Sequence, residues 1–123
     1  MALPERPVLT VVGDGASLYA IQALWTMAHH KLPITVVICT RERPGALARC
    51  LDSLFAQQYP AFRVLVVDNA PVTEATAEVV RSAARRGPVE YLVEPKAGLS
   101  FARNTAVAAA PGQILAWIDD DEY

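Results

Sequence analysis

The stretch Ile34–Thr40, with the sequence ITVVICT, decides the fold of this chain. It follows Pro33 and ends before Arg41, and most of its residues are β-branched, which favours an extended strand. Apolar residues stand at successive positions, so both faces of the strand are apolar. This pattern is typical of a strand buried on both sides in a parallel sheet. The stretch therefore predicts the central strand of an α/β domain.

Strands and helices alternate on both sides of this stretch. The other expected strands are 8–12, 62–67, 89–93 and 114–118. The expected helices are 17–30, a segment from Pro44 to just before Tyr59, 74–86 and 99–110. Strands joined by helices imply a parallel sheet with right-handed crossovers and helices on both faces. The expected fold class is α/β: a three-layer α/β/α sandwich, Rossmann-like, with a mostly parallel sheet of four to five strands in a single domain over 1–123.

Composition narrows the functional classes. The 123 residues are 53% hydrophobic, which argues against disorder. The net charge of −2 gives no bulk electrostatic reason to expect nucleic acid or an anionic membrane as a partner. No apolar run approaches the length of about 18 residues that suggests a membrane span. Cys39 and Cys50 are expected to be reduced core residues. The expected compartment is the cytoplasm, with a peripheral membrane role left open.

Polar residues stand where the expected strands end. In open α/β sheets ligands bind beyond the carboxyl ends of the strands. This rule selects the five places listed here: Gly13-Asp14-Gly15, Thr40-Arg41, Asp68-Asn69, 94–98 and 119–121. Four of these places carry carboxylates, and hard divalent cations prefer oxygen ligands. The pattern therefore favours a cation at this edge of the sheet, which could bridge to a diphosphate.

The triple aspartate Asp119-Asp120-Asp121 is the sharpest of these signals. If it stays extended, Asp119 and Asp121 project to one side and Asp120 to the other. Two carboxylates on one side can hold Mg²⁺ or Mn²⁺ and leave positions for phosphate oxygens and water. Such a metal would neutralise charge on a leaving diphosphate. The alternative interpretation is a solvated acidic segment.

Several spaced motifs after Pro33 point to one family. They are Val36 to Pro44, Leu51-Asp52-Ser53-Leu54, Val66-Val67-Asp68-Asn69, Gly98-Leu99-Ser100 with Ala102-Arg103-Asn104, and Ile118-Asp119-Asp120-Asp121. Over 33–123 the chain resembles the N-terminal, nucleotide-binding half of a family 2 glycosyltransferase with the GT-A fold. The resemblance implies a nucleotide-diphosphate sugar as the partner. It also places strand 114–118 on one side of the central strand and strand 62–67 on the other.

The resemblance further implies a role for each matched polar residue. Thr40 and Arg41 would line the pocket for the nucleotide base. Asp68 would accept hydrogen bonds from the base or ribose. Arg103 would lie near the base and the diphosphate, and Asn104 would help to hold the start of its helix. Each of these side chains could instead be a solvated or purely structural group.

For the aspartates the resemblance implies a DxD-type motif. Asp119 or Asp120 would bond the ribose. Asp121 would ligate Mn²⁺ or Mg²⁺, with Asp119 as the second candidate metal ligand. Relatives continue into an acceptor-binding half that carries the general base in inverting enzymes. No catalytic residue is therefore assigned here, and whether this chain transfers a sugar is left open.

The N-terminal segment resembles a different family. Residues 7–35, with Gly13-Asp14-Gly15, are similar to the cofactor-binding region of thiamine-diphosphate enzymes of the benzoylformate decarboxylase type. There Asp14 would ligate Mg²⁺ on the cofactor diphosphate. The second ligand of that family, an asparagine, has no counterpart near Thr40. A glycine-rich turn that only closes a strand is the favoured interpretation, and thiamine-diphosphate binding is the weaker functional alternative.

The two resemblances meet at the central strand. We therefore expect a chimera or fusion, with a thiamine-enzyme-like β-α segment at 1–33 and a glycosyltransferase-like segment at 34–123. An inactive recombinant chain is the third functional alternative. Strand 8–12 is expected to pair at the outer edge of the sheet, next to 114–118. An apolar sheet face left uncovered would favour self-association.

Overall fold

A computed structural model describes residues 9–11, 34–56, 62–110 and 114–121 of the chain. Its strands are β1 (Leu9–Val11), β2 (Ile34–Thr40), β3 (Phe62–Asn69), β4 (Val89–Glu94) and β5 (Ile114–Asp119). Its helices are α2 (Pro44–Ala56), α3 (Ala75–Ala83) and α4 (Leu99–Ala109). The helix expected at 17–30 lies outside the described residues.

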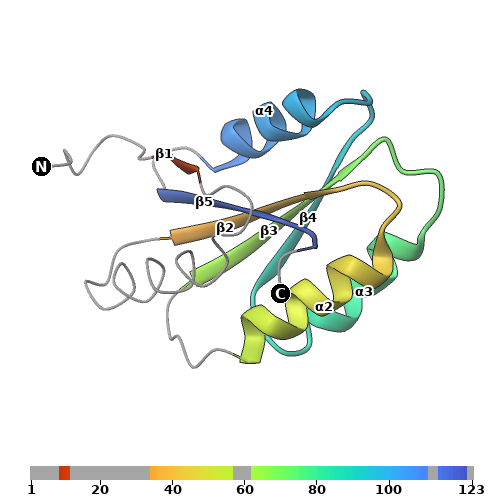
Figure 1. Ribbon diagram of the computed structural model, residues 1–123, viewed down its shortest axis with the longest axis vertical. Coiled ribbons are helices and arrows are strands. Elements are labelled where there is room, and N and C mark those ends of the chain that lie inside the picture. Colours follow the sequence, from red (N-terminus) through yellow and green to blue (C-terminus); the bar gives the residue numbers. More distant parts are fainter. Residues whose placement is uncertain (1–8, 12–33, 57–61, 111–113, 122–123) are drawn as a thin grey trace, which may run out of the picture.

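The strands form one parallel sheet in the order β1-β5-β2-β3-β4. Figure 1 shows α2 and α3 together on one face of this sheet and α4 on the other, so the described chain has three layers. The predicted fold class is confirmed. β2 is central, with β5 and β3 as its neighbours. β1 pairs with β5 at the outer edge, from Leu9 opposite Leu115 to Val11 opposite Trp117, as expected.

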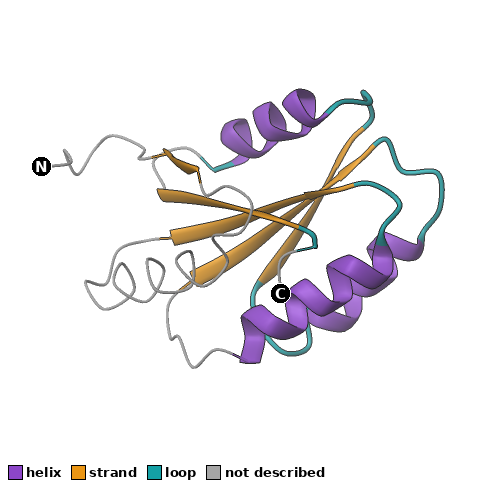
Figure 2. Ribbon diagram, in the orientation of Figure 1, coloured by secondary structure: helices purple, strands orange, loops and turns teal. Residues whose placement is uncertain are grey.

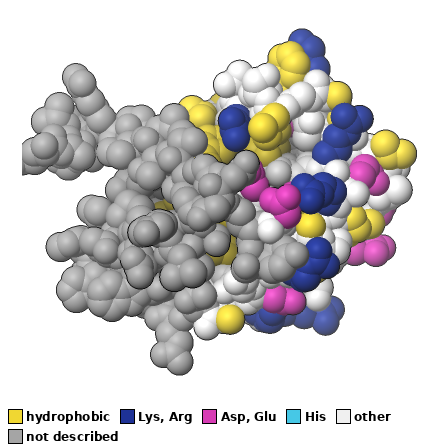
Figure 3. Space-filling model, in the orientation of Figure 1, with side chains coloured by type: hydrophobic (Ala, Val, Ile, Leu, Met, Phe, Trp, Pro, Cys, Tyr) yellow, Lys and Arg dark blue, Asp and Glu magenta, His cyan; other side chains and the backbone are white. Residues whose placement is uncertain are grey.

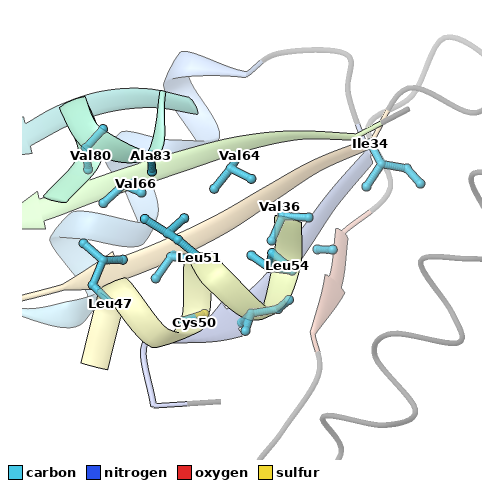
Figure 4. Packing of buried hydrophobic residues seen from close by; sticks show 13 residues of the cluster. Ile34, Val36, Leu47, Cys50, Leu51, Leu54, Val64, Val66, Val80 and Ala83 are labelled. Atoms are coloured by element: carbon cyan, nitrogen blue, oxygen red, sulfur yellow. The ribbon is translucent and has the colours of Figure 1, made fainter. Parts of the chain in front are cut away.

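Side-chain alternation along the central strands builds a core on each face of the sheet. On the α2–α3 face, Val36 and Ile38 of β2 pack with the stripe of α2, which is Leu47, Cys50, Leu51 and Leu54 (Figure 4). On the α4 face, Val37 packs with Ala102 and Ala106. These β2 side chains are fully buried, and the expected stripe of α2 is confirmed. The sheet is therefore covered by helices on both faces, as the apolar sequence of β2 requires.

The observed element ends differ from expectation at the edge of the sheet that carries the polar residues. β3, β4 and β5 each run further than expected, to Asn69, Glu94 and Asp119. Asp68 and Asp119 are therefore strand residues with neighbours in register: Thr40 lies opposite Asp68, and Cys39 lies opposite Asp119. Ladder pairing with a neighbouring strand, β2 for β5 and for Asp68 of β3, and β3 with β4 for Asn69 and Glu94, extends each strand by one or two residues, which local sequence preference does not reveal.

Helix α3 is shorter than the expected 74–86. Its regular part ends at Ala83, and the following N–H groups bond closer carbonyls: Arg85 to Ser82 and Arg86 to Ala83. This tightening into a turn precedes Gly87-Pro88, since a proline disfavours helical geometry in the residue before it. Among the described residues, no helix has both the length and the apolar character needed to cross a membrane.

Candidate functional site

A cleft of about 400 Å³ opens at the carboxyl ends of the central strands. It lies where β2, β3 and β5 end and α4 begins, which is the edge that the rule for open α/β sheets selects. Its lining residues are Cys39, Thr40, Arg41, Arg43, Asn69, Gly98, Leu99, Asp119, Asp120 and Asp121. The fold thus brings together five of the predicted site residues, which are Thr40, Arg41 and the three aspartates.

Asp120 is the most deeply buried of the three aspartates that line this cleft. Its side chain is only 6% exposed, and both of its carboxylate oxygens are engaged. Thr40 donates its hydroxyl to Oδ2 at 2.7 Å, and Arg43 donates Nη1 to Oδ1 at 2.6 Å. The Thr40 side chain is thereby committed to Asp120, although Thr40 also lines the cleft. These contacts tie the end of β5 to the end of β2.

Asp119 and Asp121 differ from Asp120 and from each other. β5 ends at Asp119, and Asp120 and Asp121 form a turn, so the argument from strand alternation does not extend past Asp119. Asp119 is partly buried, and its carbonyl accepts a long S–H bond of 3.8 Å from Cys50. Asp121 has a 56% exposed side chain that pairs with Arg43 Nη2 at 3.3 Å. Pairing with Asp121 and then Asp120 raises the pKa of Arg43, which stays charged.

The donor set suits a divalent cation that also binds a ligand. Within the described ranges, no group of three Asp, Glu, His or Cys side chains lies close enough to hold a metal unaided. Mg²⁺ in nucleotide sites commonly takes only one or two carboxylates and completes its shell with phosphate oxygens and water. Asp121, exposed at the mouth of the cleft, and Asp119 beside the Asp120 turn supply hard oxygen ligands of this kind. The residues therefore fit such a cation together with a diphosphate.

Asp68 is buried next to the cleft and does not line it. Its side chain accepts a hydrogen bond from the Tyr91 hydroxyl at 2.7 Å, and its other oxygen, Oδ1, is buried without a partner among the described residues. Burial raises the pKa of Asp68 despite the bond from Tyr91. Burial, and then the bond to Asp68, raises the pKa of Tyr91 to about 12, so its hydroxyl remains a donor. A buried acceptor without a partner is costly for the fold.

We expect Asp68→Asn to stabilise the fold at neutral pH. Because the pKa of folded Asp68 lies above its ordinary value of 3.8, its contribution to stability is fully present below pH 3.8 and is lost as pH rises through the folded value. The neutral amide removes this loss and should gain about 1 kcal/mol, since an unpaired buried amide costs less than an unpaired buried charge. Urea unfolding at several pH values measures the difference between the two proteins.

Asp52→Asn is the matched control, because the Asp52 side chain is 62% exposed in a pair with Arg86. It should change little at any pH. A difference between Asp68→Asn and the unaltered chain that does not widen as pH rises above 3.8 would show that Asp68 is not strained by burial.

Two loop braces beside the cleft have no assigned role in the sequence-based prediction. Asn69 accepts a bond from the Gly98 N–H at 2.8 Å and donates to the Lys96 carbonyl at 2.7 Å, which holds the start of α4. Gly98 has φ of +140°, a conformation suited to glycine. Asn69 thus holds the start of α4, and Asn104, for which the resemblance implies a similar role, is exposed on that helix. The Asp-Asn pair at a strand end was visible in the sequence, but its partners 27 to 29 residues away were not.

Glu42 is the second brace. It has a positive φ of 50° and accepts bonds from the backbone N–H groups of Val72 and Thr73 at 2.7 and 3.1 Å. These bonds lower the pKa of Glu42 and tie the loop after β2 to the loop after β3. The carboxylate of Glu42 is therefore engaged by the backbone of the loop after β3.

Arg103 lies on α4 and does not line the cleft. Its guanidinium lies 5.8 Å from the ring centroid of Trp117 on β5, a cation–π arrangement. It also lowers the pKa of Cys39, but burial outweighs this effect and raises the thiol pKa to about 11. Cys39 is therefore a neutral residue in the lining of the cleft, and Arg103 carries a positive charge close enough to affect it.

The charge on the visible face is mixed. Figure 3 shows Lys and Arg side chains interspersed with Asp and Glu on the described part of this face, without a broad patch of one sign. Figure 2 shows that the loops at the cleft end of the sheet join strands to helices on both faces. Local pairing at the strand ends, more than a long-range field, therefore sets the electrostatics of the cleft.

The fold and the cleft define an α/β protein of the GT-A glycosyltransferase type. Residues 35–123 match the family described as Glycosyl transferase family 2. The chain belongs to this family. Glycosyltransferase GlyA of Streptococcus pneumoniae is 30% identical over 91 residues, covering 73% of this chain and 13% of the relative. The chain thus spans only a small part of that relative.

Solved structures agree on the fold. The mannosyltransferase PcManGT from Pyrobaculum calidifontis, in complex with GDP-Man and Mn²⁺, is 25% identical with a TM-score of 0.64, over 86% of this chain and 36% of that one. S. aureus TarS in complex with UDP is 23% identical with a TM-score of 0.66, over 73% of this chain and 28% of that one. Solved structures in complex with GDP-Man and with UDP thus share the fold of this chain.

The second resemblance is also confirmed. Residues 1–48 match the C-terminal TPP binding domain of thiamine pyrophosphate enzymes. Benzoylformate decarboxylase of Pseudomonas aeruginosa is 29% identical over 90 residues, covering 73% of this chain and 17% of the relative. The two family matches overlap at 35–48, which contains most of β2. Asp14 lies outside the described residues.

Proposed function

We propose that this chain binds a nucleotide-diphosphate sugar together with Mn²⁺ or Mg²⁺, as the donor-binding part of a family 2 glycosyltransferase. The observation that carries the proposal is the turn at Asp120-Asp121. Asp120 is fixed by Thr40 and Arg43, and this leaves the Asp121 carboxylate at the mouth of the cleft. A mannosyltransferase of the same fold binds GDP-Man and Mn²⁺, which supports this assignment.

Each residue has a role in the proposed complex. Asp121, with Asp119 beside it, ligates the cation, which supplies Lewis-acid neutralisation of the diphosphate charge when bound. Asp119 or Asp120 bonds the ribose; for Asp120 this would require an acceptor lone pair beyond the bonds from Thr40 and Arg43. No residue of this chain is assigned to the transfer step itself.

The base is proposed to sit toward β2 and β3. Thr40 and Arg41 would bound the base pocket, and the exposed Arg41 is free to move over a bound ring. The unpaired Oδ1 of Asp68 would accept a hydrogen bond from a base N–H or a ribose hydroxyl if the nucleotide reaches it past Asn69. Arg103 would add positive charge behind the diphosphate.

Residues 1–123 would form one domain, with 1–33 as its thiamine-enzyme-like segment and 34–123 as the nucleotide-binding segment.

Calorimetric titration tests this function. UDP, GDP and thiamine diphosphate are each titrated with and without Mn²⁺. We expect UDP or GDP to bind in the presence of Mn²⁺ and to bind at least about tenfold more weakly without it. Thiamine diphosphate is expected not to bind. Binding of thiamine diphosphate alone would overturn the proposed function in favour of the thiamine-diphosphate alternative, and no binding of any probe would overturn it in favour of an inactive chain.

A further inference from the structure

Arg43 forks across two aspartates that lie in different environments. Its Nη1 lies 2.6 Å from Asp120 Oδ1, and its Nη2 lies 3.3 Å from Asp121 Oδ2. The Asp120 side chain is 6% exposed and that of Asp121 is 56% exposed. A short charge-assisted bond to a buried carboxylate is strong, whereas a long pair in solvent contributes little. The pair between Arg43 and Asp121 is therefore easier to break than the bond between Arg43 and Asp120.

The backbone of Arg43 is held in place while its head is exposed. The Arg43 carbonyl accepts the Leu47 N–H at 3.0 Å in the first turn of α2, and Pro44 follows at once. The preceding residue, Glu42, is bonded to the loop after β3. The Arg43 side chain is nevertheless 51% exposed. Its guanidinium can therefore leave one carboxylate by side-chain rotation, without moving α2.

A cation at Asp121 would compete directly with Arg43. Both carboxylate oxygens of Asp120 are engaged, one by Thr40 and one by Arg43. A cation that displaced these partners would leave the buried Thr40 hydroxyl without a hydrogen-bond acceptor, which is unfavourable. At Asp121 the one contact to lose among the described residues is the long, exposed pair with Nη2. Like charges repel at such short range, so the cation and Nη2 cannot both stay close to Asp121.

We propose that Arg43 is a built-in counter-ion that occupies Asp121 until a divalent cation replaces it. The inference rests on the proposed function, in which Asp121 takes the cation. On exchange, Nη1 keeps Asp120 in place and Nη2 leaves Asp121. The released Nη2 then donates to a diphosphate oxygen, a geometry that guanidinium groups favour. Arg43 would thus oppose the free cation and assist the nucleotide bound with it.

Opposite changes in two affinities test this inference. For Arg43→Gln, we expect Mn²⁺ without nucleotide to bind about two- to fivefold more tightly, since an exposed competing pair is removed. At saturating Mn²⁺, we expect UDP or GDP to bind about tenfold more weakly, since a charge-assisted donor is lost. Electron paramagnetic resonance of free Mn²⁺ measures the first affinity, and calorimetry measures the second.

Arg81→Gln is the matched control. It makes the same change in net charge and removes a 3.3 Å exposed pair, with Glu74, on α3. Both affinities should stay within about twofold of the unaltered chain, as expected for a distant screened charge. If circular dichroism shows that Arg43→Gln does not fold, Arg43→Lys decides, because lysine can retain one bond to Asp120 but cannot fork. Arg43→Lys should also bind Mn²⁺ more tightly and UDP or GDP more weakly than the unaltered chain, each by a smaller factor than Arg43→Gln.

The outcomes separate this inference from the proposed function. Weakening of both affinities in the folded variant would make Arg43 a purely structural residue and overturn the inference alone. Unchanged Mn²⁺ affinity would also overturn it. Absence of Mn²⁺-dependent UDP or GDP binding by the unaltered chain would overturn the proposed function, and the inference with it.

Discussion

Asp121→Ala is expected to weaken UDP or GDP binding in the presence of Mn²⁺ by about a hundredfold while leaving the fold intact. Loss of an outer-shell partner alone costs metal sites about 10- to 100-fold in affinity, and Asp121 is proposed as a direct ligand. Its 56% exposed side chain makes a 3.3 Å pair with Arg43 and no other ion pair within the part of the chain that the structure describes, and such pairs contribute about 0–1 kcal/mol to stability. Calorimetry with Mn²⁺ and urea unfolding measure the two effects on the same protein.

Glu74→Ala is the control for this variant. Glu74 is also an exposed carboxylate, 81% exposed in a 3.3 Å pair with Arg81, but it lies at the start of α3 and outside the cleft. It should leave Mn²⁺-dependent binding unchanged. If Asp121→Ala binds nucleotide and Mn²⁺ as the unaltered chain does, the cation is held elsewhere and the proposed metal site is wrong.

Asp120→Ala, unlike Asp121→Ala, is expected to destabilise the fold, lowering the free energy of unfolding by about 2–3 kcal/mol. The substitution removes the acceptor of the Thr40 hydroxyl, and Thr40 is only 4% exposed. A buried donor without a partner costs about 1–3 kcal/mol. Arg43 also loses its 2.6 Å bond, although its half-exposed head regains water. The loss therefore stays below the upper range measured for a broken buried ion pair. Chemical denaturation followed by circular dichroism gives the value.

Two further variants separate the contributions of Thr40 and Arg43 to this loss of stability. Asp120→Asn keeps an acceptor for Thr40 and should lose about half as much stability, since only the charged part of the interaction is removed. Thr40→Val in the Asp120→Ala background should recover stability, because it removes the stranded hydroxyl. Additive losses for Thr40→Val and Asp120→Ala would contradict a direct coupling between the two side chains.

Together the two aspartate variants separate neighbours that the sequence presents as equivalent. Asp121 is proposed to ligate the cation, whereas both carboxylate oxygens of Asp120 bond to Thr40 and Arg43 within the fold. The turn at the end of β5 divides these roles, because it buries one carboxylate beneath Arg43 and leaves the next one in solvent. In a strand of three alternating aspartates the outer two would have shared one side.

Much of the fold follows from local patterns. The apolar run at β2 predicts a central buried strand, and the stripe on α2 predicts which face of that helix is buried. Both patterns depend only on residues close together in the sequence, and their periods differ clearly. The position of β1 beside β5 was also expected, starting from the strand arrangement that the glycosyltransferase resemblance implies. Element ends were less accurate, as shown by α3 and by the longer β3 and β5.

The sequence predicted which residues lie at the site, but not which side chains or backbone groups they contact. The aspartates, Thr40 and Arg41 were correctly placed at one edge, because carboxyl ends of parallel strands meet there. Tyr91 was not foreseen as the partner of Asp68, since an aromatic residue on an edge strand is ordinarily only a core residue. The backbone bonds of Glu42 depend on its positive φ, which no sequence pattern indicated.

The sequence by itself determined the order of strands and helices, the two family resemblances and the edge of the sheet where polar residues gather. Only the tertiary structure decided which of those residues touch. Thr40 and Arg43 meet Asp120 from 80 and 77 residues away, and they do so because β5 inserts beside β2. Contacts at such separations depend on strand order and register, which arise from packing the whole sheet and not from any local preference.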